Sequence, residues 1–69
     1  MTIAQPNRVI QVRRPVVPGS RVYPMVLDGP RGFLLHELVL ADDGERRHRG
    51  RVAWDGREGW AVVIERDRA

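Results

Sequence analysis

An arginine-rich run near the C-terminal end of the chain has the residue types and the spacing to bind anions. Residues 46–51 read Arg-Arg-His-Arg-Gly-Arg. On an extended strand, Arg47, Arg49 and Arg51 project from one face at intervals of about 6.5 to 7 Å. This interval is close to the phosphate spacing along a single strand of nucleic acid. The run therefore indicates a surface for a polyanion, with Arg46 at its rim.

A tryptophan in the next segment strengthens this interpretation. A two-residue turn at Asp55-Gly56 places Trp60 opposite Arg51. Guanidinium groups beside aromatic rings are common in proteins that bind single-stranded nucleic acids, because bases stack on the ring. In the structural alternative, arginine stems cover apolar neighbours while their charged ends stay in water. The binding interpretation predicts a site for nucleic acid or an acidic protein surface, formed by Arg46, Arg47, Arg49, Arg51 and Trp60.

The charge balance has two explanations. The chain carries 12 basic residues, all of them arginine, and 9 acidic residues, for a formal net charge of +3. A basic balance favours a polyanionic partner. The composition is also typical of a bacterial chain from a GC-rich genome, where codon bias alone converts lysine into arginine. The distribution of the arginines is therefore more informative than their number.

Residues for catalysis or metal binding are scarce. The chain has no cysteine, so neither a disulfide nor a thiolate metal site can form. The two histidines, His36 and His48, are expected on opposite faces of the sheet, and metal binding needs more ligands than these. The single serine, Ser20, follows Pro-Gly in a turn and has no histidine near it in sequence. We expect a non-enzymatic protein without a cofactor.

Five strand-like runs must position these side chains. They are separated by clusters of turn residues, of which Asp-Gly is a strong hairpin signal, and they span residues 8–14, 21–27, 33–41, 47–54 and 57–65. The pattern predicts an all-β fold, either a small five-stranded antiparallel barrel or a strongly bent sheet. Pro-Val-Val-Pro at 15–18 is expected to be a rigid connection rather than a polyproline ligand.

The stretch 33–41 is ambiguous. Leu34, Leu35 and Leu38 fall on one helical face, so the alternative is an α+β fold with 33–41 helical. Nine residues is short for a helix, and Asp42 would lie at its C-terminal end, where the helix dipole disfavours anions. We therefore expect a strand.

The register of the two hairpins predicts two apolar faces. The first is expected to be the core, and it gathers Phe33, Leu35, Val39, Val52, Trp54, Ala61 and Val63. The second combines the arginines with apolar residues, so the N-terminal strands of the same chain, a second copy or a partner must cover it. Its dimer or partner residues are Leu38, Leu40, Val62 and Ile64.

The length allows one small domain, expected over 8–65, with a flexible tail at 1–7 and a loose end at 66–69. A domain of this size buries only about 60% of its unfolded surface, and small unstapled domains often gain stability by oligomerising. No apolar run is long enough to cross a membrane, and the first residues lack the features of a signal peptide. Because disulfides are absent, we expect a cytoplasmic protein.

The hairpin with a tryptophan in each arm is similar in general character to small Src-homology-3-like barrels. This resemblance implies only a compact β fold and assigns no site residue. For function, the first hypothesis is a nucleic-acid-binding module that uses the arginine strand. The alternative is a homodimeric protein-interaction module, or a small regulatory or inhibitor protein, that uses the same basic and apolar face.

Overall fold

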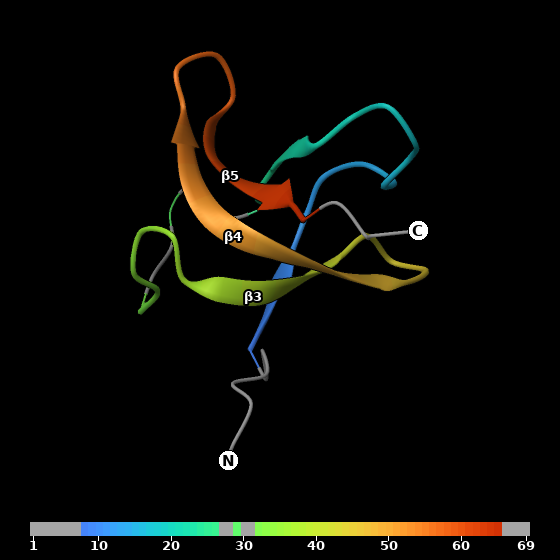
Figure 1. Cartoon of the computed structure of the whole chain (residues 1–69), viewed down its shortest axis with the longest axis horizontal. Coiled ribbons are helices and arrows are strands. Elements are labelled where there is room, and N and C mark those ends of the chain that lie inside the picture. The colour runs from blue at the N-terminus through green and yellow to red at the C-terminus, as the bar shows by residue number, and fades with distance from the viewer. Residues whose placement is uncertain (1–7, 27–28, 30–31, 66–69) are drawn as a thin grey trace.

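A computed structural model of the chain describes residues 8–26, 29 and 32–65, and the predictions for the tails 1–7 and 66–69 fall outside these residues. Within the described part, five strands form one mixed sheet and no helix occurs (Figure 1). The strands are β1 (Val9–Gln11), β2 (Val22–Pro24), β3 (Leu38–Asp42), β4 (Arg47–Asp55) and β5 (Gly59–Ile64). The all-β prediction is confirmed, and the helical alternative for 33–41 is wrong.

The sheet has the order β1-β3-β4-β5-β2. All neighbours are antiparallel except β1 and β3, which are parallel, so the prediction of a purely antiparallel sheet is wrong. A parallel pair needs a long crossover connection. Here the crossover from β1 to β3 contains β2, which lies at the opposite edge of the sheet.

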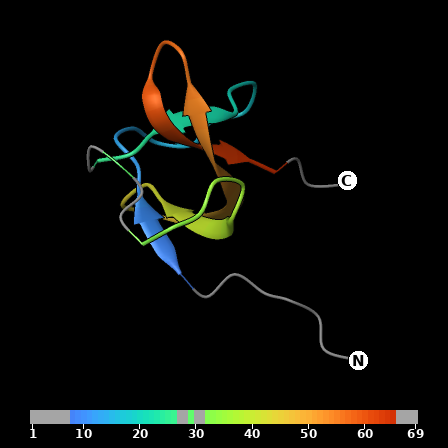
Figure 2. The ribbon, with the colours of Figure 1, turned by 90° about the vertical axis from the view of Figure 1, so that its left-hand side faces the viewer.

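The two edges of the sheet approach each other at a single bridge. Val12 and Met25 form an isolated antiparallel bridge just beyond β1 and β2. The backbone N–H of Arg13 donates to Pro24 O at 3.0 Å, and that of Val26 donates to Gln11 O at 2.9 Å. No longer ladder joins the edges within the described residues, so the sheet is strongly curled but is not a closed barrel (Figure 2).

β4 is strongly curved (Figure 1), and β5 passes close to it at Gly50. A Cβ at this position would lie 2.6 Å from Val62 Cγ1 and 2.7 Å from the backbone oxygen of Val63. Only glycine leaves enough space for β5 to pass this closely. The bend turns the inner face of the sheet onto itself and encloses the core.

The core lies on this inner face. Its buried apolar residues come from all five strands and their extensions: Ile10, Val12, Tyr23, Met25, Val39, Ala41, Val52 and Val62. The core prediction is confirmed for Val39 and Val52, and Phe33 packs against the core although it is only partly buried. Ala61 is buried as predicted, but it lies on the other face of β5, where it pairs with Ala53 and Pro24. The core prediction is wrong for Val63, which lies on the outer face, and for Trp54 and Leu35, whose exposed fractions are 61% and 52%.

The register of the β4–β5 hairpin explains the error at Val63, which pairs with Arg51 on the outer face. Trp54 keeps its predicted face and is exposed because it lies near the tip of the hairpin. Asp55 pairs with Gly59 and Trp54 pairs with Trp60, so the turn has three residues rather than two. Gly59 has a φ of 81°, and the Asp55 carboxylate accepts hydrogen bonds from the backbone N–H groups of Arg57 and Glu58. This turn shifts the register by an odd number of residues, which exchanges the faces of β5.

The register predicted for the β3–β4 hairpin is also wrong, but this error does not exchange the faces of the strands. Leu38 pairs with Arg51, and Leu40 pairs with Arg49. The shift from the predicted register is two residues, so every side chain keeps its predicted face. The strand is also shorter than predicted, because residues 33–37 form a loop in which His36 has a φ of 68°.

Candidate functional site

The predicted arginine face is only partly available for a ligand. Arg47, Arg49 and Arg51 all point outward from one face of β4, as their alternation predicts. Arg47 Nε lies 3.8 Å from a carboxylate oxygen of Asp42. Arg51 Nε lies 3.1 Å from Glu65 Oε1. Among the described residues, Arg49 has no ion pair, so it offers the least compensated charge of the three.

Trp60 does not join this face. It lies across the sheet on the inner side, directly opposite Trp54, with ring centroids 5.3 Å apart and an interplanar angle of 76°. The prediction that Trp60 lies beside Arg51 is therefore wrong, because Arg51 pairs with Val63. The arginine strand has no stacking platform from Trp60.

The predicted partner face is also divided. Leu38 and Leu40 lie on the outer face of β3, whereas Val62 and Ile64 point to the inner face of β5. Val62 is fully buried, and Ile64 packs against the core. The four residues predicted to form one surface therefore lie on two faces of the sheet, and only the two leucines are on the outer face.

A different apolar surface lies at the tip of the β4–β5 hairpin, which projects beyond the rest of the sheet (Figures 1 and 2). Trp54 is 61% exposed there. The loop before β3 runs beside β4, because the backbone N–H of His36 donates to Val52 O at 2.7 Å. This loop carries Leu34 and Leu35, both exposed. We call Trp54, Leu34 and Leu35 the Trp54 surface.

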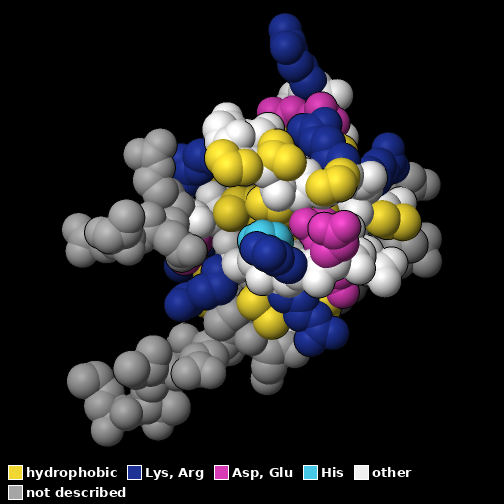
Figure 3. All heavy atoms as spheres, turned by 90° about the vertical axis from the view of Figure 1, so that its right-hand side faces the viewer, with side chains coloured by type: hydrophobic (Ala, Val, Ile, Leu, Met, Phe, Trp, Pro, Cys, Tyr) yellow, Lys and Arg dark blue, Asp and Glu magenta, His cyan; other side chains and the backbone are white. Residues whose placement is uncertain are grey.

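The structure also contains a groove that the sequence did not predict. Its volume is about 550 Å³, and it lies between the segment 16–21, the start of β4 and the end of β5. The remaining lining residues are Arg46, His48, Ile64 and Glu65. Apolar, arginine and acidic side chains meet at this end of the molecule (Figure 3). We call this site the 16–21 groove.

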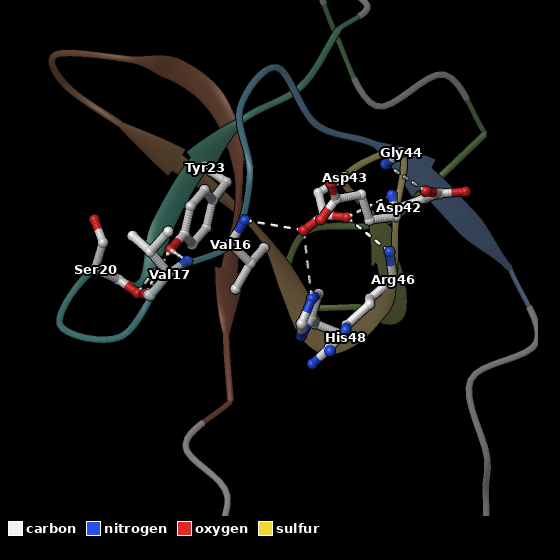
Figure 4. Close-up of polar contacts among 10 residues, drawn as sticks. Val16, Val17, Ser20, Tyr23, Asp42, Asp43, Gly44, Arg46 and His48 are labelled. Carbon is white, nitrogen blue, oxygen red and sulfur yellow. Dashed lines mark hydrogen bonds and ion pairs between the residues drawn. The ribbon is translucent and has the colours of Figure 1, made fainter.

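Two buried polar groups hold the wall of the groove in place (Figure 4). The hydroxyl of Tyr23 accepts a hydrogen bond from the N–H of Val17 at 2.9 Å and lies 3.1 Å and 3.0 Å from the carbonyl oxygens of Val17 and Ser20. On the other side, the N–H of Val16 donates to Asp43 Oδ2 at 3.0 Å. The segment is thus tied to β2 and to the β3–β4 turn.

Asp43 is the most strongly perturbed acid in the structure. Backbone N–H groups of Arg46, Val16 and Glu45 donate to its carboxylate at 2.8 to 3.0 Å and hold its pKa well below the usual range. Its side chain is only 4% exposed, and His48 Nε2 lies 3.5 Å from Oδ2. That nitrogen is buried and has no hydrogen-bond partner among the described residues.

The Asp43–His48 pair resembles part of a catalytic arrangement but has no nucleophile. The side chain of Ser20 lies at the far end of the groove wall and points away from His48 (Figure 4). No group of three or more His, Cys, Asp or Glu side chains within the described residues could hold a metal ion. The pair is best explained as support for the β3–β4 turn and the groove.

Comparisons with models of protein families, with curated proteins and with solved structures give no match. Within residues 8–26, 29 and 32–65, no helix is long and apolar enough to cross a membrane. Function must therefore be argued from the three surfaces described above.

Proposed function

We propose that this protein is a small, non-enzymatic protein-interaction module that associates with a second copy of itself through the Trp54 surface. The observation that carries the proposal is the exposure of Trp54, which is 61% despite its contact with Trp60. Tryptophan is among the residues that contribute most to protein interfaces. An exposed tryptophan, together with two exposed leucines on the loop that bonds to Val52 of the same strand, favours a protein partner over solvent.

The backbone of β4 supports the same surface. β3 stops pairing with β4 at Arg51, so the last part of β4 pairs only with β5. The N–H and C=O of Val52 point to the β3 side, where they bond to the loop at 36–37. Because pairing alternates along an antiparallel ladder, the N–H and C=O of Trp54 also point to this side, beyond the end of β3. An open strand edge of this kind binds another strand.

A second copy fits this edge well. Two β4 edges can pair antiparallel about a two-fold axis near Trp54, so the same residues serve on both chains. The pairing covers the exposed tryptophan and both leucines of each copy. It also adds buried apolar surface to a domain that is too small to bury much by itself.

Size-exclusion chromatography with light scattering tests the proposal. We expect the wild-type chain to be a dimer, and Trp54→Ser to be a folded monomer. Val17→Ser is the matched control, since Val17 is 50% exposed but lies in the 16–21 groove. It should remain dimeric, and Trp54→Phe should retain most of the association. A wild-type monomer at high concentration would exclude self-association.

A second candidate function is nucleic-acid binding by the outer face of β4. The observation that favours it is the shared outward direction of Arg47, Arg49 and Arg51, next to Arg46. The two ion pairs of Arg47 and Arg51 and the position of Trp60 weigh against it. Single- and double-stranded oligonucleotides should be titrated at two salt concentrations, because phosphate contacts make affinity fall steeply with salt. Absence of binding at low salt would exclude this function.

A further inference from the structure

We infer that the 16–21 groove binds an acidic segment of a partner protein. In this arrangement, carboxylates of the segment contact Arg21 and Arg46, and an apolar side chain between them rests on Val16 and Ile64. This inference concerns a different surface from the one proposed for self-association. Three features of the groove support it: a wall fixed by hydrogen bonds, uncompensated arginines and an aliphatic floor.

The groove exists before any ligand arrives. Its wall is fixed from one side by the Tyr23 hydroxyl, which contacts Val17 and Ser20, and from the other by the Asp43 carboxylate. Tyr23 is fully buried and the Asp43 side chain nearly so. A ligand therefore does not have to order the wall, which lowers the conformational cost of binding.

The charges that line the groove favour an anion. Four titratable residues face it: Arg21, Arg46, His48 and Glu65. Glu65, the acidic member, is already paired with Arg51 at 3.1 Å outside the groove. Asp43 lies behind His48, where three backbone N–H groups satisfy its carboxylate.

The two groove arginines are therefore left to interact with a ligand. The guanidinium of Arg21 uses Nε to donate to Ile64 O, which fixes the side chain and leaves its other nitrogens free of protein partners within the described residues. The side chain of Arg46 has no hydrogen bond or ion pair there. Two uncompensated guanidinium groups next to a pocket are a common arrangement for binding carboxylates.

The floor of the groove favours a peptide over a nucleic acid. Val16, Val17, Pro18 and Ile64 supply aliphatic surface, and no Phe, Tyr or Trp lines the groove. The one aromatic ring in the lining is the imidazole of His48, which is largely buried beside Asp43. Single-stranded nucleic acids are bound by stacking successive bases on exposed aromatic rings, for which one largely buried imidazole is a poor platform. An acidic peptide with an apolar side chain matches both the floor and the rim, because such a segment buries its apolar group while its carboxylates remain at the edge.

Fluorescence anisotropy with three labelled peptides tests the inference. The peptides alternate valine with glutamate, glutamine or lysine and are otherwise identical. We expect the glutamate peptide to bind most tightly, with an affinity that falls as salt is raised, and the lysine peptide not to bind. Equal affinity for all three peptides would overturn the inference. A labelled single-stranded oligonucleotide that binds more tightly than the glutamate peptide and is displaced by it would assign the groove to nucleic acid instead.

Variants of the groove identify the contacts. Arg46→Gln should lower the affinity for the glutamate peptide by about two- to fivefold, as expected for the loss of one solvent-accessible ion pair. Arg57→Gln is the matched control, because Arg57 is exposed at the turn of the β4–β5 hairpin, outside the groove. An unchanged affinity in Arg46→Gln would overturn the inference. Trp54→Ser should bind the peptide as the wild type does, so failure of the dimer and failure of the groove are distinguishable.

Discussion

Trp54 and Trp60 lie directly opposite each other across the β4–β5 hairpin and make an edge-to-face contact with ring centroids 5.3 Å apart. Aromatic pairs in this geometry contribute about 0.5–1.5 kcal/mol beyond the area that they bury. The contact holds Trp54 in a fixed orientation on an exposed hairpin. Trp60 is thus a supporting residue, and Trp54 is the residue available to a partner.

The pairing of the two tryptophans depends on the three-residue turn, and Gly59 is its sensitive position. The φ of Gly59 is 81°, a value that L-residues rarely adopt, so Gly59→Ala should lower the free energy of unfolding by about 1–2 kcal/mol. Gly56→Ala is the matched control, since no neighbour lies within 4 Å of an added Cβ there. Urea unfolding measures both. Equal stability of the two variants would contradict this description of the turn.

The close approach of β5 to Gly50 gives a second prediction about stability. An added Cβ meets Val62 Cγ1 at 2.6 Å and the backbone oxygen of Val63 at 2.7 Å, so Gly50→Ala should cost about 1–3 kcal/mol of unfolding free energy. Chemical denaturation measures this loss. The double variant Gly50→Ala/Val62→Ala relieves only the side-chain clash and should recover none of the stability. Full recovery would mean that the backbone of β5 is not close to Gly50.

Much of this architecture follows from local sequence signals. The runs of β-branched residues and the Asp-Gly pairs predict five strands and two hairpins, and all five strands occur. The sequence Asp-Gly-Arg-Glu-Gly at 55–59 contains two possible turns, however. The second glycine is the signal for the three-residue turn, in which a glycine with positive φ follows a type I turn. The carboxylate of Asp55 favours that turn by accepting two backbone hydrogen bonds.

The 16–21 groove could not be predicted in the same way, because its parts are distant in the sequence. Val16 reaches Asp43 across 27 residues, and Arg21 reaches Ile64 across 43. The parallel pairing of β1 with β3 brings Val16 to Asp43, and the pairing of β2 with β5 brings Arg21 to Ile64. No local pattern indicates either pairing. The one indication of the groove in the sequence is Tyr23, the only tyrosine of the chain, which lies in a predicted strand next to a Pro-Gly turn.

Tyr23 should therefore couple the stability of the fold to the shape of the groove. Tyr23→Phe removes the hydroxyl that accepts from Val17 N and contacts the carbonyl oxygens of Val17 and Ser20. Groups left without partners cost about 1–3 kcal/mol, which thermal unfolding detects. We also expect weaker binding of the glutamate peptide, because the wall of the groove loses its anchor. Wild-type stability together with wild-type affinity would show that the hydroxyl does not hold the wall.

Asp43 gives a prediction about acid stability. Its pKa in the folded chain is well below the value in an unfolded chain, about 3.9. The ionised carboxylate therefore stabilises the fold fully above that unfolded value, and this contribution is lost as the pH falls towards the folded pKa. Asp43→Asn should be less stable than the wild type at neutral pH, and the difference should narrow in acid.

Thermal unfolding as a function of pH measures the effect of Asp43→Asn. Glu45→Gln is the control, since the Glu45 side chain is exposed and makes no hydrogen bond or ion pair within the described residues. It should follow the wild-type profile. A constant difference between Asp43→Asn and the wild type from neutral pH into acid would show that ionisation of Asp43 is not what stabilises the turn.

Amide hydrogen exchange of Trp54 at several protein concentrations tests the self-association proposal most directly. The N–H of Ala53 bonds to β5 within one chain, so its protection should not depend on concentration. The N–H of Trp54 points past the end of β3 and should become protected only as the concentration rises and a second copy pairs with it. Exchange at Trp54 that stays fast and independent of concentration would contradict the proposal.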